Sequence, residues 1–457
     1  MLLGKAFSLF VEESPISVML SGTVERIFDP GVLDRVFQDN AVLGYLKELT
    51  FSRCVQIMSD VVFKESPSVG AYYQAHQDEI PVTRQAVYDK LKRMEPQVPA
   101  ALVRYSAEEL LRCVKAMGSQ ALPLLPGYRV RVLDGNHLTG TEHRIFELRH
   151  FRSAALPGQA LVFYDPRYGL ITDVVPCEDA HAQERSLLKQ ALACIARRDC
   201  ILADRNFCTS GFLFGIHRKT AFFVIRQHAS TLCYELKGKC RLAGRDGRGR
   251  DIYEQAIRLT DPETGETFTA RRITIILDKP NKDGETELHI LTNLPPKAAN
   301  AIRVADLYAD RWTIETGFQQ LTDDLRCEIN TLGYPKAALF GFCTACVAYN
   351  AVSVLKCAIR TAQGKKYVEE ELSMYYLTLE VAQVTAGMRI AIPKENWEIF
   401  RKMSVKNFAA VLIDLAQRIN PRKYTKHKRG PKTKQPKKTS GKRIHHVSTA
   451  RILAMRT

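Results

Sequence analysis

The stretch YADRWTIETGFQQLTDDL, residues 308–325, decides the fold, and it has the periodicity of a helix. Apolar residues recur along it and just before it mostly at steps of three or four, as they do on the buried side of a helix. These residues are Val304, Leu307, Ile314, Phe318, Leu321 and Leu325. We therefore expect a helix that packs one side against a core.

The neighbouring side of this helix carries polar groups that fall within about 60° of one another at a helical step of about 100° per residue. They are Tyr308, Arg311, Glu315 and Thr322. A carboxylate can hold a hard metal ion, and an arginine can bind a phosphate with two hydrogen bonds. Phosphodiester chemistry on nucleic acid requires both a metal-binding carboxylate and a phosphate-binding cation. The alternative is an exposed Arg311–Glu315 ion pair at i,i+4, which is common on helix surfaces.

The charge of the chain is concentrated in its last segment. The 457 residues are enough for two or three domains, and the formal net charge is +17. Arg418–Thr457 holds 14 Lys or Arg and no Asp or Glu, whereas the remainder holds 52 basic and 49 acidic residues. A polyanion is the natural partner of such a tail, and nucleic-acid phosphates are the leading class. A solubilising tail or a contact with anionic lipid is the alternative.

Cysteine usage and hydropathy argue against a secreted or membrane protein. The twelve cysteines are scattered, mostly in apolar surroundings, and no secretory signal precedes them, so we expect a reducing cytoplasm. The pair Cys343 and Cys346 lies in an apolar run, where core packing is favoured over zinc or redox use. That run, 337–355, is interrupted by polar residues and predicts a buried core helix rather than a membrane span.

The N-terminal region, residues 1–125, has helical periodicity throughout. Thr83 is a plausible N-cap for a helix that presents Arg84 and Lys90 outward. A short helix of this kind suits reading of a DNA groove, so we expect DNA-end binding here. A helical subdomain without a ligand is the alternative.

Two aspartates come directly after apolar strand patterns. Residues 127–133 alternate and end at Asp134, and the short apolar run 200–203 ends at Asp204. Between them, the turn at 165–169 joins two further predicted strands. The carboxyl ends of strands meet at one edge of a sheet, and a helix across the sheet can bring Glu315 to the same edge.

Three carboxylates at one point repel one another unless cations neutralise them. Two divalent ions about 4 Å apart would do so and would clamp the attacking and leaving oxygens of a phosphodiester. Mg²⁺ prefers such an all-oxygen shell, and we expect Mn²⁺ to substitute for it. Other acids compete for the role, although Asp165 is explained by its turn and Asp173 as an outward-facing strand residue. The remaining competitors are Glu142, Glu178 and Asp179.

The order of these motifs resembles the insertion-sequence-four family of bacterial DDE transposases, over most of residues 125–355. That family has two strand-end aspartates, a β-rich insertion and the helix signature Tyr-x2-Arg-x3-Glu-x6-Lys. The resemblance implies that Asp134, Asp204 and Glu315 are the catalytic metal ligands. It also implies that Tyr308 and Arg311 contact DNA phosphate near the cleaved end. For Trp312 it suggests stacking on a DNA base, with packing against the core as the alternative.

One position departs from the family signature. The final Lys is Thr322 in this chain. A hydroxyl can hydrogen-bond phosphate but brings no charge, so strand positioning is weakened or Arg326 substitutes one turn on. Because no metal ligand changes, we expect the chemistry to survive.

The resemblance implies an α/β (α+β) chain in which a β-rich insertion interrupts a ribonuclease-H-like catalytic core. The expected core segments are 126–228 and 296–365, with the insertion at 229–295. The N-terminal helical domain is 1–125, and helices at 366–417 precede the basic tail 418–457. The tail residues expected to bind DNA include Arg422, Lys423, Lys428 and Arg429.

The resulting hypothesis is a bacterial DNA transposase, cytoplasmic and nucleoid-associated when bound to DNA. Two protomers would pair terminal inverted repeats, cut by metal-activated water and join the freed 3′-hydroxyl to target DNA. The resemblance also suggests a hairpin at the excised ends. A metal-dependent nuclease without strand joining and a catalytically silent DNA-binding protein remain open. An RNA-binding tail is disfavoured because Tyr424 is the only aromatic residue there.

Overall fold

The computed structural model describes residues 3–43, 48–118, 122–138, 140–142, 145–146, 149, 155–228, 232–281, 284–312, 314, 329, 331–427 and 430. Five of the residues expected at functional positions lie outside these ranges: Glu315, Thr322, Arg326, Lys428 and Arg429.

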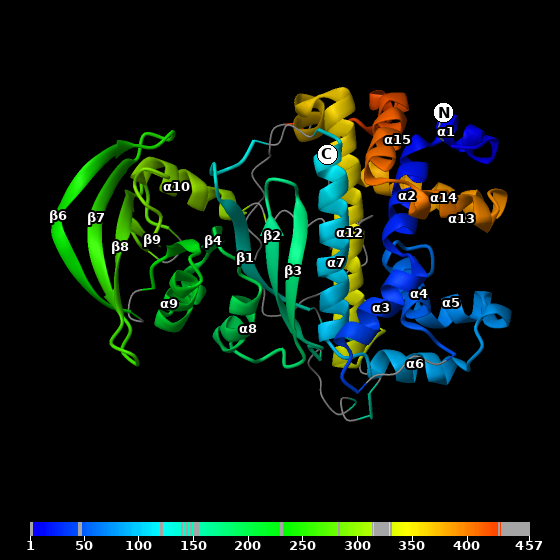
Figure 1. Cartoon of the computed structure of the whole chain (residues 1–457), viewed down its shortest axis with the longest axis horizontal. Coiled ribbons are helices and arrows are strands. Elements are labelled where there is room, and N and C mark those ends of the chain that lie inside the picture. Colours follow the sequence, from blue (N-terminus) through cyan, green and yellow to red (C-terminus); the bar gives the residue numbers. More distant parts are fainter. Residues whose placement is uncertain are drawn as a thin grey trace, which may run out of the picture.

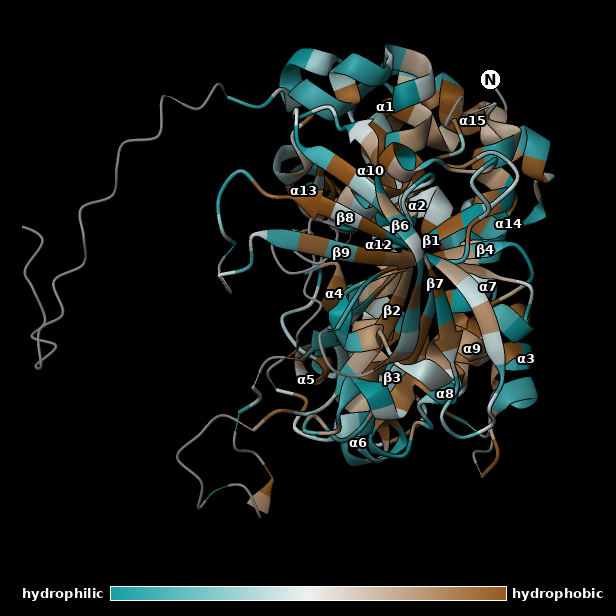
Figure 2. Ribbon diagram, turned by 90° about the vertical axis from the view of Figure 1, so that its left-hand side faces the viewer, coloured by the Kyte–Doolittle hydropathy of each residue, from teal (hydrophilic) through white to brown (hydrophobic). Residues whose placement is uncertain are grey.

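Helices form the whole described N-terminal region, as the sequence predicts (Figure 1). They are α1 (Ser8–Glu13), α2 (Pro15–Ile27), α3 (Pro30–Asn40), α4 (Phe51–Val62), α5 (Val69–Ala75), α6 (Arg84–Lys92) and α7 (Gln97–Ala116), with short 3-10 helices η1 (Lys5–Phe7) and η2 (Gln77–Glu79). Thr50, Ser68 and Thr83 each accept a hydrogen bond from a backbone N–H of the helix that follows, which confirms the N-cap predicted at Thr83. In Figure 2, α6 lies at the outer margin and is largely hydrophilic.

A mixed sheet forms the centre of the molecule, with the strand order β3-β2-β1-β4-β5-β9-β8-β7-β6. Its strands are β1 (Arg129–His137), β2 (Gln159–Asp165), β3 (Leu170–Cys177), β4 (Asp199–Ala203), β5 (Phe222–Arg226), β6 (Cys233–Arg245), β7 (Asp251–Thr260), β8 (Thr267–Ile276) and β9 (Glu287–Thr292). β1 pairs in parallel with β4, and β4 with β5, while the other neighbours are antiparallel. β6–β9 form the expected meander, and β9 pairs with β5, so the meander continues the core sheet.

The two faces of the sheet bury different sets of side chains, because residues alternate along each strand. Val132 and Leu202 belong to the large core shared with the N- and C-terminal helices. Leu133 and Ala203, one residue further along the same strands, belong to a second core. The helices of that second face are α8 (Leu188–Ala193), which follows η4 (Glu184–Leu187), and α9 (Ser210–Arg218), which follows η5 (Arg205–Phe207).

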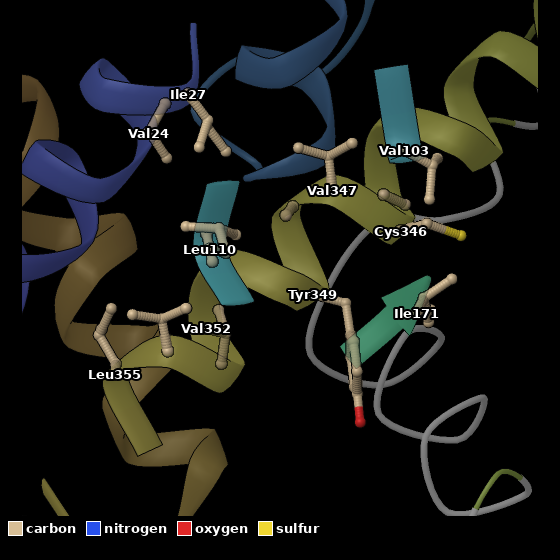
Figure 3. Close-up of a cluster of buried hydrophobic side chains, with 14 of the residues drawn as sticks. Val24, Ile27, Val103, Leu110, Ile171, Cys346, Val347, Tyr349, Val352 and Leu355 are labelled. Atoms are coloured by element: carbon tan, nitrogen blue, oxygen red, sulfur yellow. The ribbon is translucent and has the colours of Figure 1, made fainter. Parts of the chain in front are cut away.

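The long helix α12 (Pro335–Gln363) runs through the large core and contacts α2, α4, α7 and β3 (Figure 3). In that view Val347, Val352 and Leu355 point among side chains of α2 and α7, and Tyr349 lies near Ile171 of β3. Among the described residues, α12 alone is apolar and long enough to cross a membrane, and its most apolar window is wholly buried. This confirms a core helix, in which both Cys343 and Cys346 are buried.

The remaining elements complete the helical half and the site. α10 (Ala301–Ala309) and η6 (Asp310–Trp312) follow the meander, and the C-terminal elements are η7 (Tyr367–Glu371), α13 (Met374–Ala391), α14 (Lys394–Lys402), α15 (Val405–Arg418) and η8 (Pro421–Tyr424). The helix expected across residues 308–325 therefore changes at Ala309 into a 3-10 turn, a common feature of helix ends. Arg311 lies in that turn.

Candidate active site

The register between β1 and β4 brings the two predicted aspartates together. Val132 lies opposite Leu202 in the parallel pair. The same register carried two residues further places Asp134 opposite Asp204. Both side chains then share the sheet face of Val132 and Leu202, since successive residues alternate.

Asp134 does not lie at the end of its strand, and that part of the prediction is wrong. β1 continues to His137 because Asp134 and the following residues remain paired with β2, where Asp134 lies opposite Val162. The pairing of β1 with β4 does end near Asp134, because it extends only to Val132. Asp204 directly follows β4, as expected.

A local backbone amide holds each aspartate. Asp134 Oδ1 accepts a hydrogen bond from the N–H of Gly135 at 3.0 Å. Asp204 Oδ1 accepts one from the N–H of Asn206 at 2.8 Å and so caps η5. Each carboxylate keeps further acceptor capacity for another donor or a metal ion.

The turn after α10 brings a cation to Asp134. Arg311 Nη1 lies 3.2 Å from Asp134 Oδ2, and Arg311 is only 8% exposed. Tyr308, at the end of α10, is 7% exposed and hydrogen-bonds the side chain of Arg311. Arg311 therefore lies against the first aspartate, and Tyr308 lies beside Arg311. Trp312 ends η6, and its side chain lies outside the described part of the chain.

The site carries more negative charge than Arg311 neutralises. The pKa of Asp134 is raised to about 6, chiefly by burial and less by the charges of Asp204 and Glu184, against the lowering effect of Arg311. The pKa of Glu184 is also raised, first by burial and then by the charge of Asp204.

Glu184 is the residue that the sequence reasoning missed. It opens η4 and is half-buried beside Gly135 of β1. A Cβ built on Gly135 would lie 1.8 Å from its Oε1 atom, so its carboxylate occupies the space that a side chain at position 135 would fill. The signal in the sequence was the glycine directly after Asp134, because a glycine within a strand often marks a close approach.

Asp134 and Asp204 fit a divalent metal as part of an oxygen donor set. Their carboxylates share one face of the sheet and repel each other, and burial makes that repulsion stronger than in water. Within the described part of the chain, no three His, Cys, Asp or Glu side chains are grouped closely enough to hold a metal ion. Glu315, the predicted third ligand, lies outside that part.

Two further arginines lie near Tyr308 and Asp204, and both pair with Glu285. Arg226, at the end of β5, forms an ion pair with Glu285, and its charge lowers the pKa of Tyr308, although burial raises that pKa overall. Arg205, directly after Asp204, lies 3.7 Å from Glu285. An anionic ligand at the aspartates would therefore meet cations from several elements.

The other predicted DNA contacts lie on the helical half. Arg84 is exposed at the start of α6, whereas Lys90 lies 4.8 Å from the ring centre of Phe37, and burial lowers the pKa of Lys90. Arg422 and Lys423 are exposed on η8.

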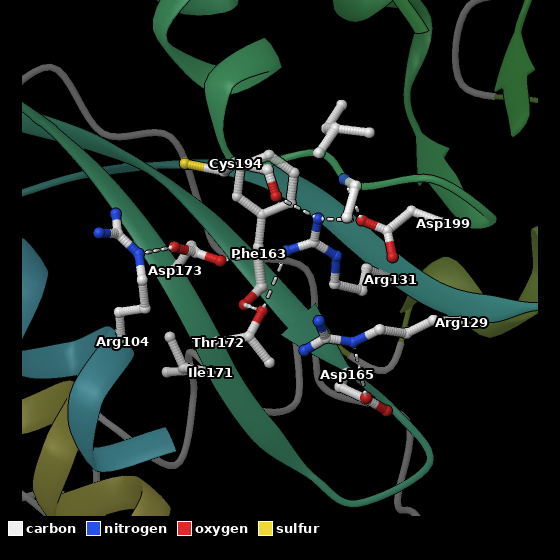
Figure 4. Close-up of polar contacts among 12 residues, drawn as sticks. Arg104, Arg129, Arg131, Phe163, Asp165, Ile171, Thr172, Asp173, Cys194 and Asp199 are labelled. Carbon is white, nitrogen blue, oxygen red and sulfur yellow. Dashed lines mark hydrogen bonds and ion pairs between the residues drawn. The ribbon is translucent and has the colours of Figure 1, made fainter. Parts of the chain in front are cut away.

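A second buried ionic cluster lies at the opposite end of β1 (Figure 4). Arg131, 1% exposed, contacts Asp173 at 3.1 Å and Asp199 at 2.5 Å, and Arg104 contacts Asp173 at 2.7 Å. Asp173 is thus buried and paired, and the prediction that it faces outward is wrong. Asp165 accepts a hydrogen bond from the N–H of Arg167 in its turn, as expected.

One comparison with known proteins covers the segment that carries this site. A family model described as the transposase DDE domain matches residues 125–351. No curated protein matches the chain. A solved piggyBac transposase synaptic complex with hairpin DNA is similar at 10% identity and a TM-score of 0.38, covering 82% of this chain and 73% of that one, a likeness too low to carry an argument. Over residues 125–351, the chain is therefore similar to the transposase DDE domain.

Proposed function

We propose that this protein is the DNA transposase of a bacterial insertion sequence, and that it cuts and joins DNA at terminal inverted repeats by two-metal phosphoryl transfer. The observation that carries the proposal is the position of Asp134 and Asp204, each two residues beyond the paired Val132 and Leu202 of adjacent parallel strands, inside a segment that matches the transposase DDE domain. The ion pair between Arg311 and Asp134 adds a phosphate-binding group at the same place.

The strand arrangement supports a ribonuclease-H-like core. Its antiparallel β1, β2 and β3 are followed by parallel β4 and β5, in the order β3-β2-β1-β4-β5. The Tyr308, Arg311 and Glu315 spacing supports membership of the insertion-sequence-four family, with Thr322 in place of its final Lys.

The roles of the residues follow from their positions. Asp134, Asp204 and Glu315 would hold two Mg²⁺ ions, for which Mn²⁺ substitutes. When bound, these ions polarise the phosphodiester and make a water molecule or a 3′-hydroxyl a stronger nucleophile. Arg311 neutralises Asp134 in the absence of DNA and can turn its guanidinium to a phosphate oxygen near the cleaved bond. Tyr308 orients Arg311 through their hydrogen bond, and burial of both side chains limits the access of bulk water.

Other parts of the molecule would position the DNA. The exposed Arg84 on α6 contacts the terminal inverted repeat, and the basic tail contacts phosphates without reading sequence. Two protomers pair the two ends in the DNA complex. The protein acts in the cytoplasm, on the nucleoid.

The proposal is tested with linear DNA that ends in the inverted repeat found beside the gene. With Mg²⁺, the wild-type protein should cleave at the element end and produce joined products, whereas Glu315→Gln should do neither. Cleavage without joining identifies a nuclease. DNA binding without metal-dependent cleavage, unchanged in Asp134→Ala, identifies a silent DNA-binding protein. Either result contradicts a transposase.

A further inference from the structure

We propose that Glu184 is a positioning residue that holds both aspartates in place from the opposite face of the sheet, and so sets the affinity of the site for divalent cations. The inference rests on the proposed function, because it concerns the same metal site. It adds a residue outside the Asp134, Asp204 and Glu315 set.

The first part of the argument is the contact with Gly135. Glu184 Cδ would lie 2.7 Å, and Oε1 1.8 Å, from a Cβ at that position, so only a glycine admits the carboxylate there. The backbone conformation does not require the glycine, since Gly135 lies within β1 opposite Leu161 and is not among the glycines of positive φ. The N–H of this same residue donates to Asp134.

The second part is the contact with Asn206. Its Nδ2 lies 3.4 Å from Glu184 Oε2, and its backbone oxygen accepts a hydrogen bond from Arg185 Nε at 3.1 Å. The N–H of Asn206 donates to Asp204. Glu184 thus touches two residues, and the backbone of each holds one of the two aspartates.

The contacts of Glu184 counteract the electrostatic repulsion between the two aspartates. Asp134 and Asp204 repel each other when no metal is bound, and the strands that carry them are no longer paired with each other beyond Val132. A side chain that contacts both Gly135 of β1 and Asn206 of η5 resists the separation of the two aspartates. Its negative charge also makes the site more attractive to cations, in the way that groups behind metal ligands commonly tune affinity.

The test is Mn²⁺ binding to the full-length protein without DNA, followed by the loss of the free-ion signal in electron paramagnetic resonance. Glu184→Gln keeps the shape and an acceptor for Asn206 but removes the charge. We expect it to weaken Mn²⁺ binding about tenfold with an unchanged melting temperature in EDTA. Glu178→Gln makes the same charge change nearby, on a side chain that is 46% exposed, and should bind as the wild type does.

A double-mutant cycle tests the geometry. Gly135→Ala should displace Glu184 and weaken Mn²⁺ binding, and Glu184→Gln should then add little, because its effect has already been lost. Gly211→Ala is the matched control, since a Cβ there meets nothing within 4 Å. Full additivity of the two changes would overturn the inference.

The outcomes separate this inference from the proposed function. If Asp134→Asn and Asp204→Asn weaken Mn²⁺ binding but Glu184→Gln does not, Glu184 has no positioning role and the metal site stands. If neither aspartate variant changes Mn²⁺ binding, both the metal site and the role of Glu184 are wrong.

Discussion

An ionic cluster lies toward each end of β1, one at Arg131 and one at Asp134, and the two are balanced in opposite ways. At one end, Arg131 is enclosed by Asp173 and Asp199, and Arg104 adds a second cation (Figure 4). At the other end, the charges of Asp204 and Glu184 raise the pKa of Asp134. Among the described side chains, Arg311 alone forms an ion pair with Asp134. The first cluster is complete within the protein and holds strands together. The second cluster has too little positive charge to balance its carboxylates, which suits a site that binds added cations.

The largest expected effect comes from removing a carboxylate at the acidic end. Asp204→Asn should reduce Mg²⁺-dependent cleavage of the element end by on the order of a thousandfold, because a neutral amide is a poor partner for the cations that stabilise the transition state. Gel assays of end-labelled DNA measure it, with Glu178→Gln as the control. Cleavage within a few fold of wild type would remove Asp204 from the chemistry.

The next largest effect is on folding, at the balanced end. Arg131→Met should lower the free energy of unfolding by about 3–5 kcal/mol, because it leaves Asp173 and Asp199 buried without their main cation. Arg104→Met should cost less, since Arg104 is 47% exposed. Urea unfolding followed by circular dichroism measures both. If both variants lose the same free energy of unfolding, the deeper burial of Arg131 does not make its ion pairs more important for stability.

The third prediction is that replacing an aspartate by asparagine has opposite effects on stability in the two clusters. In EDTA at pH 7.5, Asp134→Asn should stabilise the protein by about 1–3 kcal/mol, whereas Asp173→Asn should destabilise it. The pKa of Asp134 rises from 3.8 to about 6 on folding, so the folded state binds more protons than the unfolded state between these values. Stability is therefore lost as pH rises from about 4 to about 6, and the asparagine variant avoids that loss.

The measurement is the free energy of unfolding of both variants from pH 3.5 to pH 8. The advantage of Asp134→Asn should shrink as the pH falls below 6 and be nearly lost at pH 3.5, where the wild-type carboxyl is mostly protonated in both states. If the asparagine variant stays more stable than the wild type by the same amount at low pH, the effect does not come from ionisation of Asp134.

The smallest effect comes from removing the basic tail. Tyr424 is buried and donates a hydrogen bond to Glu380 at 2.5 Å, and the N–H of Lys426 donates to Glu371. Truncation at Arg418 would remove these contacts, so the chain should end after His427. The salt dependence of DNA binding should then flatten by about two or more units of slope. An unchanged slope would exclude the tail as a phosphate contact.

Local patterns predicted much of the fold around the site. The alternating residues 127–133 predicted β1, and the apolar run 200–203 predicted β4. The turn at 165–169 predicted the β2–β3 hairpin, and Thr83 predicted the start of α6. These features depend on neighbours in the sequence, which is why they could be predicted.

Long-range contacts explain what the sequence did not reveal. The length of β1 beyond Asp134 depends on pairing with β2, and Gly135 itself has low strand propensity. Arg131 and Asp173 are 42 residues apart, and Glu184 reaches Gly135 from a helix on the other face of the sheet. Neither contact has a local signature apart from the glycine.

The most direct test of the account is a crystal structure of the protein with Mn²⁺, with the metal located by its anomalous scattering. We expect a peak bound by carboxylate oxygens of both Asp134 and Asp204, with Glu315 completing the protein ligands and Arg311 turned away from Asp134. A peak elsewhere, or Glu315 too far from the two aspartates to share a metal ion, would contradict the central claim.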